Sequence, residues 1–124
     1  MSAAAVTADA LGAPFVRGDE APWVEAGPGV RRQVLAAGPD LMLVRVEFAA
    51  GAEGAVHHHP HRQATYVAAG AFAATVGGER QTLRAGDSFF AAADVPHGVV
   101  ALEAGTLVDV FTPAREDFLP GAAR

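Results

Sequence analysis

The sequence predicts an all-β protein, because short apolar runs with an alternating pattern are separated by turn residues at close intervals. Between Val30 and Thr112, glycine and proline divide the chain into pieces of strand length. These turn signals are Gly38-Pro39-Asp40, Gly51 to Gly54, Pro60, Gly77-Gly78, Gly86-Asp87, Pro96 and Gly105. Short strands of this kind, with no helical period between them, are typical of a sandwich or a barrel.

Length and composition support one globular domain. The chain has 124 residues, of which 51% are hydrophobic and 19% charged, and its net charge is −5. The acidic balance disfavours a nucleic-acid partner. The absence of cysteine excludes disulfides, thiolate metal ligands and a cysteine nucleophile, so a metal here needs histidine, carboxylate or amide ligands. All nine basic residues are arginine, which excludes Schiff-base chemistry on lysine.

Three parts of the chain are expected. Residues 1–20 show no clean period and are predicted to form an N-terminal arm, residues 21–119 the domain, and residues 120–124 a C-terminal tail. The start of the chain lacks the basic region of a secretory signal, and no uncharged stretch is long enough to span a bilayer. We therefore expect a cytoplasmic protein with no membrane partner.

The strand pattern is clearest in the first half of the chain. Met42, Val44, Val46 and Phe48 fall on one face of a strand, with the charged residues between them on the other face.

The segment from Val67 to Val76 is rich in alanine and would favour a helix on propensity alone. Gly70 at its centre argues instead for two strands that meet there. Thr75 to Arg80 predicts a tight hairpin, because Gly77-Gly78 can supply the positive φ angles of its turn.

Four of the five histidines lie between Val56 and Gln63. In a strand, His57 and His59 point to one side and His58 to the other. Gln63 could add an amide oxygen after the bend at Pro60, and His97 could complete a metal site from a distant strand. The alternative interpretation is a solvated histidine loop that binds metal only adventitiously.

A second group of candidate residues lies near the C-terminus. Leu107, Asp109 and Phe111 share one face of a strand, and an acid among apolar residues is costly to bury unless it is paired or used. Arg115 could pair with Asp109 as a structural ion pair, with Phe111 in the core or an interface. Arg115 could instead bind a substrate carboxylate through its two-pronged guanidinium group.

The histidine spacing matches a known family. The patterns G-x5-H-x-H-x3-Q-x6-G from Gly51 to Gly70 and G-x5-A-x-D-x2-H from Gly86 to His97 resemble the two cupin motifs. Glutamine replaces the usual glutamate in the first motif, and alanine and aspartate replace proline and glycine in the second. This resemblance implies a single-domain cupin, a double-stranded β-helix or jelly-roll barrel.

Within the cupins, the chain resembles the pectin-degradation proteins from about Pro22 to Leu119. The segments that carry the likeness are Pro22-Trp23, Gly29 to Leu35, Gly38 to Glu47, His59 to Val67, Pro96 to Val99 and Asp109 to Phe118. Members of that family open the ring of 4,5-unsaturated monouronates, which pectin and alginate lyases make, to give linear 5-keto-4-deoxyuronates. Arg62 and the run Ala91 to Ala93 depart from the family pattern without touching an expected ligand.

The resemblance implies a site and a cofactor. His57, His59, Gln63 and His97 would hold one divalent transition metal (Zn, Ni, Mn or Fe), and Asp109, Phe111 and Arg115 would line the active site. It also implies a homodimer. The alternatives are an iron-dependent cupin dioxygenase acting on a small substrate and a non-catalytic cupin that binds a sugar or an acid.

Four other residues receive no role in the site. His58 and His61 are expected to point outward or to support the ligands, and Arg31 and Arg32 to lie on a solvated strand face or a dimer contact.

Overall fold

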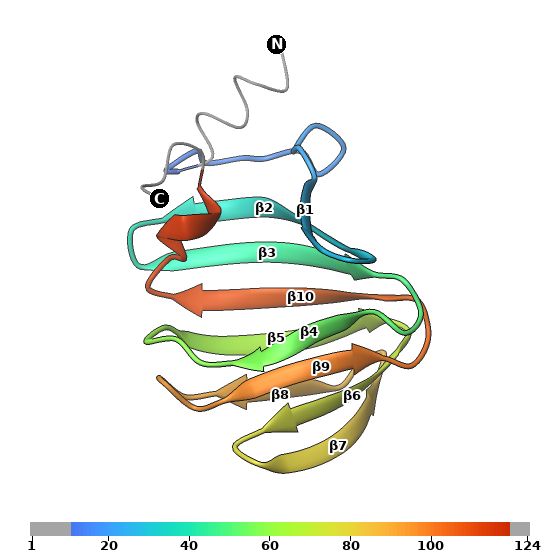
Figure 1. Ribbon diagram of the computed structural model, residues 1–124. Coiled ribbons are helices and arrows are strands. Elements are labelled where there is room, and N and C mark those ends of the chain that lie inside the picture. Colours follow the sequence, from blue (N-terminus) through green and yellow to red (C-terminus); the bar gives the residue numbers. More distant parts are fainter. Residues whose placement is uncertain (1–10, 120–124) are drawn as a thin grey trace.

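The computed structural model describes residues 11–119, which form two antiparallel β-sheets and one short 3-10 helix (Figure 1). The predicted all-β class and the jelly-roll architecture are confirmed. Residues 1–10 of the expected arm and the expected tail, residues 120–124, lie outside the described residues. The elements are β1 (Val24–Gly27), β2 (Val30–Gly38), β3 (Leu41–Phe48), β4 (Glu53–His57), β5 (Arg62–Ala69), β6 (Ala71–Val76), β7 (Glu79–Arg84), β8 (Ser88–Ala91), β9 (His97–Ala101), β10 (Gly105–Thr112) and η1 (Glu116–Phe118).

The strand order brings distant parts of the chain together. The six-stranded sheet has the order β1-β2-β3-β10-β5-β8, and the four-stranded sheet has the order β4-β9-β6-β7. In the larger sheet, β10 lies between β3 and β5, and in the smaller sheet β9 lies between β4 and β6 (Figure 1). The last two strands therefore complete both sheets, and they carry Asp109 and His97 into the middle of the fold.

The core forms where the apolar faces of the two sheets meet. Met42, Val44 and Phe48 are buried, as the alternating pattern of β3 predicts. The ring of Phe48 packs edge-on against Phe72 of the other sheet, with the ring centroids 5.2 Å apart. Burying two such rings stabilises the fold by about 1.5–3 kcal/mol each, so this pair is a main contact between the sheets.

Gly70 ends β5 and begins the turn into β6, as predicted. Its φ is +84°, and a Cβ atom at this position would lie 2.6 Å from the carbonyl oxygen of Ala104. Only glycine fits this close approach, so the turn overrides the helical preference of the surrounding alanines. The predicted Gly77-Gly78 hairpin between β6 and β7 is also present.

The N-terminal segment follows the outside of the larger sheet. The buried Gln33 side chain donates hydrogen bonds of 2.9 Å to the carbonyl oxygens of Gly18 and Ala21, and it accepts one from Arg45. Leu11 also forms a bridge with Ala37. These bonds hold the described part of the expected arm against β2. Among the described residues, no helix has the length and apolar character needed to cross a bilayer.

Candidate metal centre

Three histidines converge where the two sheets approach each other. His57 is the last residue of β4, His97 is the first residue of β9, and the two are paired in the strand register. His59 lies in the connection after β4, so the expected strand ends before it. The ligand atoms of His57, His59 and His97 nevertheless lie within 4.8 Å of one another.

Backbone carbonyl groups fix the protonation of all three rings. The Nδ1 atoms of His57, His59 and His97 lie 2.8, 3.0 and 2.8 Å from the carbonyl oxygens of Ala55, His61 and Val95. A carbonyl oxygen can only accept, so each Nδ1 carries the proton and donates it. Each Nε2 atom of a neutral ring is then left with a free lone pair, the form in which histidine binds metals.

Gln63 adds an oxygen atom to this group. Its Oε1 atom lies 3.1 Å from His59 Nε2 and 3.0 Å from His97 Nε2. Its Nε2 atom donates to Thr65 Oγ1 at 2.9 Å and to Asp109 Oδ1 at 3.4 Å, which fixes the orientation of the amide. The Gln63 oxygen, which can only accept a hydrogen bond, therefore faces two ring nitrogens that also lack a proton to donate.

A cation bound between these atoms would satisfy their lone pairs. Protonating the rings would not do so readily, because burial lowers the pKa of His59 and of His97. Three imidazole nitrogens and one amide oxygen form a donor set that suits a divalent transition metal. The residues present thus fit the metal expected from the sequence.

Asp109 lies next to the proposed ligands and is buried. Its Oδ1 atom accepts a hydrogen bond of 2.6 Å from Thr65 Oγ1 and the longer one from Gln63. Burial raises the pKa of Asp109 from an ordinary 3.8 to about 6, although the bonds from Thr65 and Gln63 and the charge of Arg115 lower it. Burial thus moves the pKa of Asp109 toward the range in which a carboxyl group can act as a general acid or base.

Arg115 does not form the ion pair with Asp109 that one sequence interpretation allowed. Its Nε and Nη2 atoms donate to the two carboxylate oxygens of Asp117 at 3.0 and 2.9 Å. The guanidinium group also lies over the rings of Phe118 and Phe111, 4.3 and 5.3 Å from their centroids. Its positive charge acts on Asp109 through space while its hydrogen bonds go to Asp117.

Phe111 is 2% exposed and belongs to the core. Its ring packs edge-on against His59 at a centroid distance of 5.9 Å, and against Phe118 at 5.7 Å. The structure therefore places Phe111 in contact with a proposed ligand, where it restricts the orientation of the imidazole ring.

A cavity of about 160 Å³ adjoins the histidines. Its polar lining includes His57, Gln63, His97, Asp109 and Arg32. The remaining lining residues are mostly apolar: Ala26, Val30, Val46, Phe48, Gly54, Phe89, Gly98, Val99, Leu107 and Phe118. Arg32 was expected on a solvated strand face or at a dimer contact. Its side chain lines the cavity instead, so the expectation of a solvated face was wrong.

The other two histidines lie around the group. His58 is exposed, and its Nδ1 atom lies 3.7 Å from Asp94. His61 accepts the His59 hydrogen bond through its backbone oxygen, while its own Nδ1 atom is buried without a partner among the described residues. His61 thus supports the orientation of His59 through its main chain.

The sequence and the fold are similar to those of known proteins. Residues 44–111 match the family model described as Cupin domain. The pectin degradation protein KdgF of Dickeya dadantii (strain 3937) is 48% identical over 103 residues, covering 82% of this chain and 94% of that protein.

Two solved structures share both sequence and fold with the chain. An RmlC-like cupin from Shewanella frigidimarina NCIMB 400 is 44% identical with a TM-score of 0.84, over 86% of this chain and 96% of that one. KdgF from Halomonas sp. is 42% identical with a TM-score of 0.81, over 87% of this chain and 99% of that one.

Proposed function

The chain belongs to the cupin family, and we propose that it is a metal-dependent enzyme of pectin or alginate breakdown that opens the ring of 4,5-unsaturated monouronates. The product is the linear 5-keto-4-deoxyuronate. Similarity to two proteins named KdgF, one of them described as a pectin degradation protein, supports the substrate class. The observation that carries the chemistry is the buried Asp109 carboxyl group, hydrogen-bonded to the proposed ligand Gln63.

The reaction moves one proton and breaks one bond. The substrate is a cyclic hemiacetal whose ring oxygen is attached to C5 of a C4=C5 double bond. The C1 hydroxyl group loses its proton, the bond from C1 to the ring oxygen breaks, and C1 becomes an aldehyde. The enol oxygen left on C5 becomes a ketone when C4 gains a proton, so the atoms balance without an oxidant or a co-substrate.

The proposed metal ligands are His57, His59, Gln63 and His97. A divalent metal bound there supplies Lewis acidity that stabilises negative charge on a carboxylate or an enolate oxygen. The backbone carbonyls that fix each Nδ1 proton keep the three rings in the tautomer that this role requires.

Asp109 is the residue we propose for proton transfer. Its buried carboxylate, next to the proposed ligands, can accept the C1 hydroxyl proton. The protonated carboxyl group can then return a proton at C4, directly or through water. Thr65 holds the carboxyl group in place through its 2.6 Å hydrogen bond.

Arg115 and Phe111 complete the proposed active site. Arg115 adds positive charge that favours the ionised form of Asp109, and Phe111 holds the His59 ring. We propose that Arg115 borders the bound sugar, as the family resemblance implies, whereas Phe111 acts from the core through the His59 ring.

A turnover assay tests the proposal. Lyase-generated unsaturated monouronate is followed by the loss of its C4=C5 ultraviolet absorbance, with and without a chelator, against an enzyme-free control for spontaneous opening. We expect acceleration that the chelator removes. Asp109→Asn should abolish turnover while the metal stays bound, and Asp40→Asn, at an exposed turn residue, should not change the rate.

Two other outcomes would point to the alternatives. Oxygen consumption with added iron would favour a dioxygenase. Binding of metal and uronate without turnover, with Asp109 dispensable, would favour a non-catalytic binding protein. Full activity in Asp109→Asn would remove this residue from the mechanism.

The same proposal covers the finer features expected from the sequence. These are the division into residues 1–20, 21–119 and 120–124, a homodimer, a cytoplasmic location and a metal chosen from Zn, Ni, Mn and Fe. Light scattering, cell fractionation and elemental analysis of the purified protein test the last three, and limited proteolysis tests the division.

A further inference from the structure

We propose that Arg32 is the residue that binds the carboxylate of an acidic sugar in the cavity beside the histidine group. The identity of the acid as a uronate rests on the proposed function. The assignment of the anion-binding residue rests on the charge and geometry of the cavity itself.

Strand geometry directs Arg32 into the cavity. On β2, Val30 and Arg32 line the cavity, whereas the intervening Arg31 is exposed on the opposite face. Arg32 is paired with Val46 on β3, and Val46 with Leu107 on β10.

The same register sets the distance between Arg32 and the proposed acid–base residue. Asp109 lies on β10, two strands away from Arg32, and lines the same cavity. Their backbones are therefore separated by at least two strand spacings, about 10 Å. Both side chains line the same cavity, which has a volume of about 160 Å³.

Two arginines share the ring of Phe118 but differ in their hydrogen-bond partners. The guanidinium groups of Arg32 and Arg115 lie over the Phe118 ring, 4.0 and 4.3 Å from its centroid. Asp117 acts on Arg32 through its charge, but its two carboxylate oxygens accept hydrogen bonds from Arg115. Arg115 therefore has a hydrogen-bonded anion, whereas Arg32 does not.

Arg32 is the arginine of this pair without a bonded partner in the described part of the chain. In residues 11–119, no hydrogen bond or ion pair to the Arg32 side chain is found, although the residue is only partly exposed. Burial lowers its pKa, Asp117 raises it and Arg115 lowers it. A partly desolvated guanidinium group gains most from a carboxylate that can accept two parallel hydrogen bonds.

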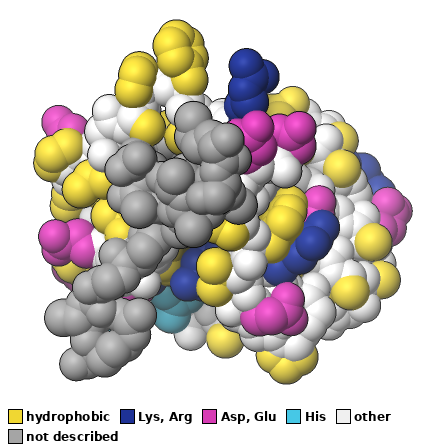
Figure 2. All heavy atoms as spheres, turned by 90° about the horizontal axis from the view of Figure 1, so that it is seen from above, with side chains coloured by type: hydrophobic (Ala, Val, Ile, Leu, Met, Phe, Trp, Pro, Cys, Tyr) yellow, Lys and Arg dark blue, Asp and Glu magenta, His cyan; other side chains and the backbone are white. Residues whose placement is uncertain are grey.

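Arg115 is less suited to this role in its present arrangement. A substrate carboxylate would have to displace Asp117 from the two nitrogen atoms that already donate to it. Arg32 requires no such exchange. On the face shown in Figure 2, a histidine side chain and an arginine side chain lie next to each other.

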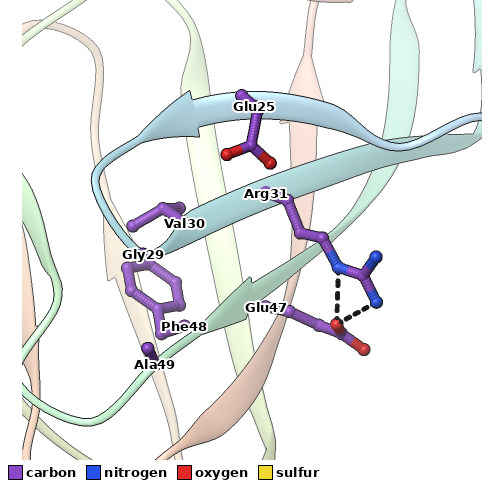
Figure 3. A pocket seen from close by; sticks show the side chains of 7 residues that line it. All are labelled: Glu25, Gly29, Val30, Arg31, Glu47, Phe48 and Ala49. Carbon is purple, nitrogen blue, oxygen red and sulfur yellow. Dashed lines mark hydrogen bonds and ion pairs between the residues drawn. The ribbon is translucent and has the colours of Figure 1, made fainter.

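The neighbouring Arg31 provides a matched control. It carries the same charge on the same strand, but its Nε atom donates to Glu47 at 2.8 Å, and its guanidinium lies 4.0 Å from the Trp23 ring centroid. Figure 3 shows Arg31 reaching across to Glu47 on β3, in a separate pocket that contains neither the histidines nor Asp109.

Calorimetric binding with the metal-loaded protein tests the inference without turnover. The probes are D-galacturonate, a saturated uronate that cannot undergo the reaction, and D-galactose, its neutral counterpart. The native protein and Arg31→Met should both prefer galacturonate, and Arg32→Met should lose that preference by about tenfold or more. Arg32→Lys, which retains the charge without the two-pronged geometry, should fall between them.

Two results in this experiment would overturn the inference. One is a native protein without a preference for galacturonate. The other is a preference that survives in folded, metal-loaded Arg32→Met; its loss in Arg115→Met would then assign the carboxylate to Arg115. If Arg32→Met does not fold, Arg32→Lys and Arg32→Gln take its place, because both retain most of the side-chain length.

Kinetics separate this inference from the proposed function. On unsaturated monouronate, Arg32→Met should raise KM about tenfold or more with a smaller change in kcat, and added guanidinium ion should restore part of the loss. If the native protein shows no turnover but prefers galacturonate through Arg32, the proposed function fails and the inference stands. If turnover is metal-dependent and Arg32→Met leaves KM and the galacturonate preference unchanged, the function stands and the inference fails.

Discussion

Replacing Asp109 with asparagine should change how the stability of the chelator-treated protein depends on pH. Burial raises the pKa of Asp109 to about 6 in the folded protein, against 3.8 for an ordinary aspartate. The folded state therefore holds this proton more tightly than the unfolded chain does. Stability from this group is fully present at low pH and is lost as the pH rises from about 4 to about 6.

The size of the effect follows from the same shift. A difference of about two pKa units corresponds to about 3 kcal/mol, of which about 2.5 kcal/mol falls between pH ~4 and pH ~8. Asparagine has nearly the same shape and retains the Oδ1 acceptor for Thr65 and Gln63, but it does not ionise. The stability advantage of Asp109→Asn over the native protein should therefore grow by about 2.5 kcal/mol over this interval.

Urea denaturation at a series of pH values measures this difference directly. The chelator is needed because a bound cation would stabilise the Asp109 carboxylate. Asp40→Asn removes one carboxylate at an exposed turn position and serves as the control for net charge. Native and Asp109→Asn stability curves that run parallel from pH ~4 to pH ~8 would refute the argument that burial dominates the environment of Asp109.

Two further predictions concern the metal centre and the fold. Titrating a divalent transition metal into the chelator-treated protein should raise its melting temperature, by the equivalent of about 2.7 kcal/mol at a hundredfold excess over Kd. His97→Ala should respond far less, and His58→Ala, at an exposed position, should respond like the native protein; equal responses would contradict the assigned ligands. Gly70→Ala should lower the free energy of unfolding by about 3 kcal/mol, because its Cβ meets the backbone. Gly78→Ala, with a similar φ of +86° and open space around it, should cost only about 1–2 kcal/mol, and matching losses would show that the Gly70 contact is unimportant.

Much of the fold could be predicted because it depends on periodic patterns and on single turn residues. The burial of alternate residues in β3 and β10 follows directly from their sequences. Gly70 could be recognised as a break because a strained turn needs glycine whatever its neighbours prefer. The convergence of His57, His59 and His97 was suggested by motif spacing, whereas their tautomers depend on carbonyl groups that only the folded backbone brings near.

Contacts made by side chains across strands could not be predicted in the same way. The orientation of the Gln63 amide depends on Asp109, 46 positions later in the chain, and on the Thr65 hydroxyl group. Arg115 bonds to Asp117, two residues further on, in a segment with no strand period to restrict its direction. One signal was present but not used: in a strand, the adjacent Arg31 and Arg32 must face opposite sides, so one of them had to point inward.

The hydrogen bonds of Gln63 connect the metal centre to the proposed proton-transfer residue. Its carbonyl oxygen faces the histidines, so its amide nitrogen must face Thr65 and Asp109. A glutamate at this position would place a second carboxylate about 3.4 Å from Asp109, where two negative charges would raise the pKa of one of them sharply. An amide avoids this repulsion and donates to Asp109, which favours the ionised form needed to accept a proton. The glutamine in place of the usual cupin glutamate therefore suits a site in which a carboxylate next to the ligands acts as a base.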